Sequence, residues 1–252
     1  MLKPLKWYRS LSRVKDRVRH GAFVVEGPRA VEQVVRCAPE RLLEVVIAEG
    51  VDVELPSNVP IRRLEPRQFA GVASSRTPQG VLAVVSLPSD VAASELPPGT
   101  GGDILLCEDV QDPGNIGNLV RCAAAFGFGG VILSETCADP FGPKAVQASA
   151  GTVVTVWVRR TAEYLMLTQQ LKERGHVLVA TDTHGEERWS PEAGTPLIVA
   201  VGSEGSGLSE ALLGMADTVV RIPFDSSRAE SLNVASAGAI CMHAAFVRRR
   251  RE

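Results

Sequence analysis

Residues 197–208 read LIVAVGSEGSGL, in which an uninterrupted apolar run is followed at once by a loop rich in glycine. Such a run is typical of a strand that is buried on both faces of a parallel sheet. Similar runs occur at 104–107, 130–133, 153–158, 177–180 and 218–222, and helical patterns lie between them at 116–126, 143–150, 162–174, 209–215 and 230–248. This alternation predicts an α/β fold in which residues 96–252 form one parallel-sheet domain.

A segment rich in proline, glycine and serine, residues 86–102, separates this region from the first part of the chain. We read it as a linker and place the domain boundary between residues 95 and 96. Residues 1–95 are expected to form a small α/β domain. Its elements are a basic helix near 4–20, a helix at 28–37, and strands at 23–26, 43–48 and 80–85.

Charge is unevenly distributed between the two predicted domains. Residues 1–95 carry 14 basic and 11 acidic residues, a net +3, whereas residues 96–252 carry 13 and 18, a net −5. The basic groups are dense in the first twenty residues, where Trp7 and Tyr8 lie among them. Basic groups with aromatic neighbours suit phosphate contact and base stacking. The alternative is a solvated helix face whose apolar side, with Leu11, Val14 and Val18, packs inward.

Several classes of protein are disfavoured by composition. The five cysteines include no C-x-x-C pair and the four histidines lack ligand spacing, so we expect neither a disulfide framework nor a metal site. No apolar segment is long enough to cross a bilayer, and the first residues lack the apolar core of a signal peptide. We therefore expect a cytoplasmic protein without a membrane partner.

Polar motifs follow three of the predicted strands. Residues 112–121 read DPGNIGNLVR, in which Asn115 is suited to cap a helix and Arg121 follows six residues later. Residues 201–208 read VGSEGSGL, whose G-x-x-G-x-G spacing differs from that of the dinucleotide fingerprint and of a P-loop. Residues 230–236 read ESLNVAS, where Ser231 or Asn233 suits a helix cap. Taken singly, each motif is explained by turn and cap chemistry.

In this order the three motifs resemble the signature motifs of the SpoU/TrmH branch of the SPOUT RNA methyltransferases. Residues 21–34 (GAFVVEGPRAVEQV) and 74–85 (SSRTPQGVLAVV) resemble the RNA-binding domain, similar to certain ribosomal proteins, that often precedes the catalytic domain. The resemblance implies a catalytic sheet with a deep trefoil knot, and a homodimer whose active site is completed across the interface. It also implies S-adenosyl-L-methionine as the cofactor.

The family's functional positions can be carried over to this sequence. The resemblance assigns cofactor contacts, largely through backbone groups, to Gly202, Ile222 and Leu232, and it assigns catalysis to Arg121, Asn115, Glu204, Ser231 and Asn233. Arg121 is expected to act on a ribose 2′-hydroxyl. Because arginine is normally protonated, it acts either as an assisted base or as an electrostatic stabiliser of the alkoxide. The resemblance also leads us to expect that Asn115 and Glu204 orient Arg121, and that Ser231 and Asn233 hold the loop and the substrate. The sulfonium is already activated, so no metal is required.

The expected activity is methylation of a ribose 2′-hydroxyl in RNA, with ribosomal RNA favoured over transfer RNA by the N-terminal domain. One alternative is a catalytically inactive RNA-binding or ribosome-assembly protein on the same fold. A second alternative, a nicotinamide-dependent oxidoreductase, lacks the glycine fingerprint after its first strand.

One stretch departs from the family pattern. Phe224 replaces the usual methionine, and residues 225–229 lack glycine and are one residue longer. We predict that this loop bulges towards the RNA, so that Arg228 contacts a phosphate. The alternative is that Arg228 pairs with Asp225 or Glu230 at the surface.

Overall fold

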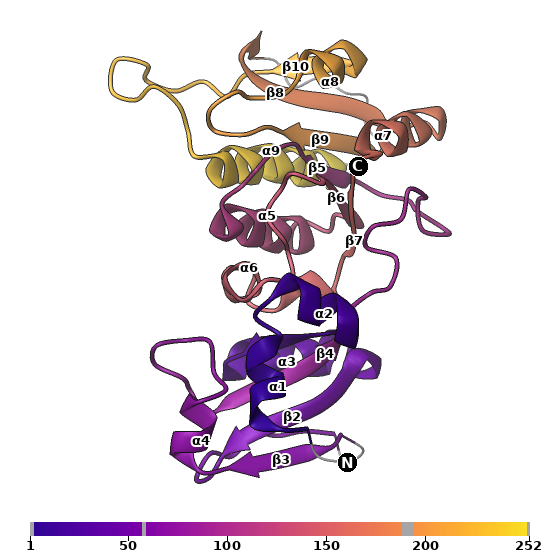
Figure 1. Cartoon of the computed structure of the whole chain (residues 1–252). Coiled ribbons are helices and arrows are strands. Elements are labelled where there is room, and N and C mark those ends of the chain that lie inside the picture. The colour runs from indigo at the N-terminus through magenta and orange to yellow at the C-terminus, as the bar shows by residue number, and fades with distance from the viewer. Residues whose placement is uncertain (1–2, 57–58, 188–193, 251–252) are drawn as a thin grey trace. The chain divides into compact units, whose positions relative to one another are not determined.

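A computed structural model describes residues 3–56, 59–187 and 194–250 of the chain (Figure 1). The chain divides into two compact units. The N-terminal unit comprises residues 1–89 together with 139–155, and the C-terminal unit comprises residues 90–138 and 156–252. Separate functions for residues 1–95 and 96–252 remain a prediction.

The N-terminal unit is built on a four-stranded sheet in the order β1-β4-β2-β3. Strand β4 runs antiparallel to both of its neighbours, whereas β2 and β3 are parallel. The strands are β1 (Ala22–Glu26), β2 (Leu42–Ala48), β3 (Ile61–Leu64) and β4 (Val81–Ser86), and the short helices are α1 (Leu5–Ser10), α2 (Val14–His20), α3 (Pro28–Cys37), η1 (Pro39–Arg41), α4 (Pro66–Ala70), α6 (Pro143–Ala148) and η2 (Thr152–Val154). Helix α3 begins and ends where the sequence pattern predicts.

The single basic helix predicted near residues 4–20 is wrong, because the chain forms α1 and α2 with a break between them. The Ser10 and Ser12 hydroxyls donate to carbonyls three residues earlier, and Arg13 is extended. These local bonds compete with a continuous helix. The buried core contains Leu11, whereas Val14 and Val18 are exposed.

The aromatic and basic side chains of this segment divide into structural and exposed groups. Tyr8 is buried and donates to a Glu44 carboxylate oxygen at 2.8 Å, so it is not available to stack on a base. Arg17 is buried, and donates to the Leu11 and Ser12 carbonyls and to Asp139. The other basic groups described here are exposed, namely Lys3, Lys6, Arg9, Arg13, Lys15 and Arg19.

The C-terminal unit contains a six-stranded sheet in the order β10-β8-β9-β5-β6-β7, and every pair of neighbours is parallel. The strands are β5 (Ile104–Cys107), β6 (Gly130–Ser134), β7 (Trp157–Thr161), β8 (Val177–Glu186), β9 (Leu197–Val201) and β10 (Thr218–Val220). The predicted parallel α/β fold is confirmed. The strand predicted at 153–158 is wrong at its start, because residues 152–154 form η2 and β7 begins at Trp157.

Helices cover both faces of this sheet: α5 (Pro113–Ala125) and α9 (Val234–Arg249) lie side by side, while α7 (Tyr164–Glu173) and α8 (Glu210–Met215) pack on β6–β8 (Figure 1). Ile104 and Leu106 join the core cluster with residues of α7 and α8, and the intervening Leu105 is equally buried. Burial of both faces explains the apolar runs and leaves polar residues to the strand ends.

Two absences hold for the part of the chain that the structure describes. No helix there is long and apolar enough to span a membrane. No group of three or more His, Cys, Asp or Glu side chains there is arranged to hold a metal ion.

Close packing of α5 on α9 depends on a glycine. Gly238 is buried, and a methyl group at this position would overlap Leu119, which is itself fully buried. We therefore expect Gly238→Ala to lower the free energy of unfolding by about 1–3 kcal/mol, measured by urea denaturation. Gly214→Ala is the matched control, because Gly214 lies in α8 with open space around it. This change should stabilise the protein by about 0.5–1 kcal/mol. Equal effects of the two substitutions would contradict the proposed packing.

Candidate active site

The first motif forms the turn between β5 and α5. Asp112, rather than Asn115, is the N-cap, because its Oδ1 accepts from the backbone N–H of Asn115 at 3.0 Å and Pro113 occupies the first helical position. The predicted capping role of Asn115 is therefore wrong. Asn115 lies one turn into the helix, so its carboxamide remains available for other partners.

The second motif is a tight loop after β9. Ser203 and Gly207 exchange backbone hydrogen bonds of 3.2 and 3.0 Å, which fold the loop back on itself. A side chain on Gly202 would overlap the backbone of Gly207 and Leu208, so this close approach requires glycine. The loop ends at Ser209, whose hydroxyl accepts from the Leu212 N–H and so caps α8.

The third motif starts α9. Asn233 is the N-cap, with Oδ1 accepting from the N–H groups of Ala235 and Ser236 at 2.9 and 3.3 Å. Because capping uses only the oxygen, the Nδ2 group is free to donate elsewhere. Ser231 precedes the cap and is exposed.

Hydrogen bonds join the three motifs. Asn233 Nδ2 donates to Asn115 Oδ1 at 3.1 Å, and Asn115 Nδ2 donates to Glu204 Oε1. We call Asn115, Glu204 and Asn233 the motif triad. Glu204 and Asn233 are exposed, and Asn115 is partly buried, so the triad lies at the surface rather than in the core.

Arg121 does not join the triad. It is exposed on α5, and makes no hydrogen bond or ion pair with another residue in the described ranges. Six residues correspond to about 600° of helical rotation, so Asn115 and Arg121 point about 120° apart around the helix. Arg121 therefore donates no hydrogen bond to Asn115 or Glu204 within the described residues, and both its orientation by these residues and its catalytic role remain predictions.

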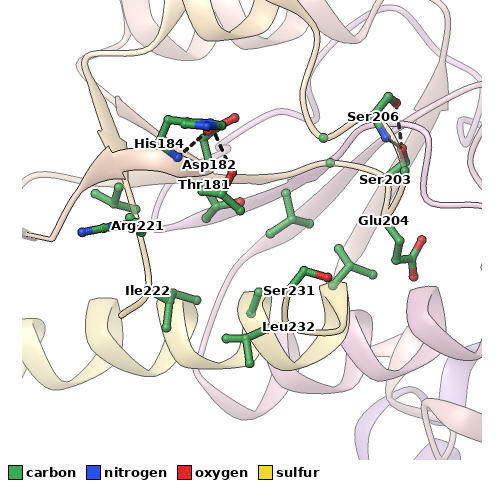
Figure 2. A pocket seen from close by; sticks show the side chains of 18 of the residues that line it. Thr181, Asp182, His184, Ser203, Glu204, Ser206, Arg221, Ile222, Ser231 and Leu232 are labelled. Atoms are coloured by element: carbon green, nitrogen blue, oxygen red, sulfur yellow. Dashed lines mark hydrogen bonds and ion pairs between the residues drawn. The ribbon is translucent and has the colours of Figure 1, made fainter. Parts of the chain in front are cut away.

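A pocket of about 340 Å³ opens beside the triad, between the ends of β8, β9 and β10 and the start of α9 (Figure 2). Gly202, Ile222 and Leu232 all line it, as do Glu204 and Ser231. Its lining includes apolar side chains, namely Val201, Val220, Phe224, Val234 and Ala237 in addition to Ile222 and Leu232. Apolar walls with a few polar groups at the rim fit an adenine ring and its attached chain.

Sequence reasoning missed part of this pocket. Thr181, Asp182, Thr183, His184 and Arg221 also line it. Thr181 to His184 directly follow the apolar run at 177–180, and Arg221 is the polar residue near the end of the run at 218–222, so their position was an available signal.

A buried carboxylate supports the second loop from the sheet. Glu108, at the end of β5, accepts from the backbone N–H and hydroxyl of Ser209 at 2.6 and 2.7 Å, and from the Tyr164 hydroxyl. Burial, and then the hydrogen bond to Glu108, raise the pKa of Tyr164 to about 12. The Tyr164 hydroxyl therefore stays protonated at neutral pH and donates a hydrogen bond to Glu108. We assign this network a structural role.

The loop at 225–229 forms a compact turn. The Asp225 carbonyl accepts from the N–H groups of Arg228 and Ala229, and Arg228 Nε lies 3.2 Å from Asp225 Oδ2. Surface pairing, the alternative to a phosphate contact, is therefore the arrangement in this chain. No residue of 225–229 is among the described residues that line the pocket.

Comparison with known proteins identifies the family to which the three motifs belong. Residues 103–243 match the SpoU rRNA methylase family, and residues 3–83 match the MRM3-like substrate binding domain. A 23S rRNA guanosine 2′-O-methyltransferase of Bacillus subtilis is 29% identical, with 95% of this chain and 94% of that protein covered. A 23S rRNA uridine 2′-O-methyltransferase of Streptomyces viridochromogenes is 30% identical, with 97% and 89% covered.

Solved structures give the same result. The SpoU methyltransferase AviRb of Streptomyces viridochromogenes in complex with AdoMet has a TM-score of 0.81 and 26% identity over 99% of this chain and 98% of that one. An AdoMet-bound rRNA methyltransferase of Sinorhizobium meliloti has a TM-score of 0.80 and 25% identity, with 98% and 94% covered. The family match spans more than half of the chain and includes all three motifs, so the chain belongs to the SpoU rRNA methylase family.

Proposed function

We propose that this protein transfers a methyl group from S-adenosyl-L-methionine to a ribose 2′-hydroxyl in RNA, and that the RNA is ribosomal. The observation that carries the proposal is the junction of three motifs at the mouth of one pocket, where the motif triad adjoins the wall formed by Gly202, Ile222 and Leu232. The names of the relatives support ribosomal RNA as the substrate.

The residues present fit the cofactor. Ile222 and Leu232 offer apolar surface to an adenine, and the Gly202 loop allows backbone groups to approach it. Bound there, the cofactor supplies an activated methyl group.

Two tasks remain for the chain's own side chains. The motif triad holds the pocket rim in one geometry, because it ties α5, the β9 loop and the start of α9 together. Arg121 is exposed and unengaged by described residues, so it can meet an RNA phosphate or stabilise the negative charge that develops as the 2′-hydroxyl loses its proton. Ser231, at the pocket wall, is placed to hold the loop or the substrate.

The same proposal includes a homodimer and a knotted C-terminal segment, both implied by the family. An exposed Arg121 is consistent with a site that is completed by a partner subunit or by RNA. We also place the protein in the cytoplasm, where ribosomal RNA is modified.

The N-terminal unit is proposed to bind RNA. Its match to a substrate binding domain and its exposed basic groups at the first two helices support this role. The segment 139–155 packs within this unit, so deletion of residues 1–95 would remove its packing partners. Substitution of surface charges is therefore the cleaner test.

An inactive RNA-binding protein is the competing function, and calorimetry with S-adenosylhomocysteine separates the two. We expect the wild-type protein to bind this product with measurable heat, because the pocket is formed and open. A protein whose site has decayed gives no heat.

Arg121→Ala should lower the rate of methyl transfer to transcribed 23S ribosomal RNA by about 10²–10³-fold, as expected for loss of a group that stabilises developing charge. Affinity for S-adenosylhomocysteine should stay within about twofold, because Arg121 does not line the pocket. Arg174→Ala is the matched control, since Arg174 is an exposed arginine of the same unit at the end of α7. Wild-type turnover by Arg121→Ala would contradict the catalytic role.

Replacement of Lys6, Lys15 and Arg19 together by glutamine should weaken RNA binding and reduce its salt dependence. Each lost phosphate contact lowers the slope of log K against log salt by roughly 0.7–0.9. Cofactor affinity should not change, because all three lie in the N-terminal unit. The control is a triple variant that conserves charge, with Lys6→Arg, Lys15→Arg and Arg19→Lys, which should bind as the wild type. An unchanged salt slope in the glutamine variant would exclude these residues from the RNA contact.

A further inference from the structure

Strand β8 leaves the sheet at the pocket. Ala180 pairs with Val219 of β10, but the next residue of β10, Val220, pairs with Glu186. Residues 181–185 therefore form a bulge that has no partner on β10. A side chain on Gly185 would place its Cβ 2.6 Å from the Val220 carbonyl carbon, so the return of β8 to the sheet requires glycine. Bulges of this kind re-aim side chains and are frequent beside active sites.

The bulge places Asp182 among the residues that line the pocket. Thr181 Oγ1 donates to the Ala200 carbonyl at 2.9 Å, which fixes the first residue of the bulge. Asp182 Oδ1 accepts from the backbone N–H of His184 at 2.7 Å and lies 3.1 Å from His184 Nδ1. Asp182 Oδ2 has no hydrogen bond or ion pair with the described residues, and the side chain is 22% exposed. One carboxylate oxygen therefore holds the turn, and the other has no partner among the described residues.

Charges of both signs occur at the end of the pocket where Asp182 lies. Figure 2 shows Asp182, His184, Arg221 and Ile222 towards one end, Ser203, Glu204 and Ser206 at the other, and Ser231 and Leu232 between them. Arg221 is the only permanent cation among the described residues that line the pocket. Its guanidinium pairs with Glu187 at 2.6 Å, and both side chains are about half exposed. Such an exposed pair contributes little, so Arg221 can exchange Glu187 for a ligand at small cost.

We propose that this end of the pocket recognises the amino-acid part of the cofactor, with Asp182 binding the α-ammonium group and Arg221 the α-carboxylate. The inference rests on the proposed function, since it takes S-adenosyl-L-methionine as the ligand of this pocket. A zwitterion cannot be buried against the apolar lining without paired charges. Among the described residues that line the pocket, the opposite end offers Glu204 but no cation, so within this set only the Asp182 end matches both charges of the ligand.

The alternative role for Asp182 is structural, as the acceptor that holds the β8 bulge. Asp182→Asn separates the two roles, because an asparagine oxygen still accepts from the His184 N–H but carries no charge. A structural role predicts no loss in this variant, or an equal loss for every ligand of the pocket. Recognition of the ammonium group predicts a loss only for ligands that contain it.

The test is calorimetry on the full-length protein with S-adenosylhomocysteine and with 5′-methylthioadenosine, which has the same nucleoside but lacks the amino-acid part. Asp182→Asn and Arg221→Gln should each weaken the affinity for S-adenosylhomocysteine roughly tenfold, as expected for loss of a charge-assisted hydrogen bond. Binding of 5′-methylthioadenosine should change by less than about twofold. Arg228→Gln is the matched control, because Arg228 is an exposed arginine paired with an acid outside the pocket, and it should leave both affinities unchanged.

A third ligand separates the two charged contacts. Decarboxylated S-adenosylmethionine keeps the amine but lacks the carboxylate. Asp182→Asn should therefore weaken its binding, whereas Arg221→Gln should not. The inference is overturned if Asp182→Asn weakens the binding of S-adenosylhomocysteine and of 5′-methylthioadenosine equally, which would indicate a role in the bulge or at the ribose. It is also overturned if Asp182→Asn leaves the affinity for S-adenosylhomocysteine unchanged. Failure of the wild-type protein to bind either nucleoside would instead overturn the proposed function, and this inference with it.

Discussion

The hydrogen bonds of Asn115 with Glu204 and Asn233 are the interaction on which the site depends. They join loops that are widely separated in sequence and that emerge from the same edge of the parallel sheet. Each loop begins or ends at a strand or helix with buried residues. The loops therefore keep little conformational freedom once Asn115, Glu204 and Asn233 are hydrogen-bonded to one another. Asn233 has a double role, because its oxygen starts α9 while its amide group reaches Asn115. Loss of this side chain would therefore disturb the helix and the pocket rim together.

Exposure of this network has a chemical consequence. Charges and hydrogen bonds at a wet surface contribute little to stabilising a transition state, because water screens them. The proposed function therefore requires that RNA or a second subunit cover the triad and Arg121 before the reaction. The cofactor pocket is different, since its apolar lining is already formed by the fold. We infer that cofactor binding uses a largely preformed site and that catalysis requires its completion.

The sheet of the C-terminal unit was predictable because burial on both faces removes polar residues from each strand. Strands β5 and β9 begin and end where the apolar runs do. The strand predicted at 153–158 was wrong at its start because Val153 and Val154 are buried in a short helix, and burial alone does not distinguish helix from strand. The basic helix was wrong because two serines satisfy local carbonyls, a competition that periodicity does not reveal.

At the site, the sequence predicted which residues lie together more accurately than it predicted which contacts they make. Gly202, Ile222 and Leu232 share one pocket as expected, whereas Asp112 took the capping role predicted for Asn115. The β8 bulge could not be predicted, because it depends on the pairing of Val220 with Glu186 across two strands. Its one local signal is Gly185, where a tertiary contact rather than the local sequence excludes a side chain.

The proposed function is methylation of a ribose hydroxyl in ribosomal RNA. The most direct measurement incubates ribosomal RNA from a strain that lacks the protein with the purified protein and deuterium-labelled S-adenosyl-L-methionine. The RNA is then digested to nucleosides, which are identified by mass spectrometry. We expect one labelled nucleoside whose trideuteromethyl group is retained on the ribose fragment. A label on the base fragment, or no labelled nucleoside from a folded protein that binds the cofactor, would contradict it.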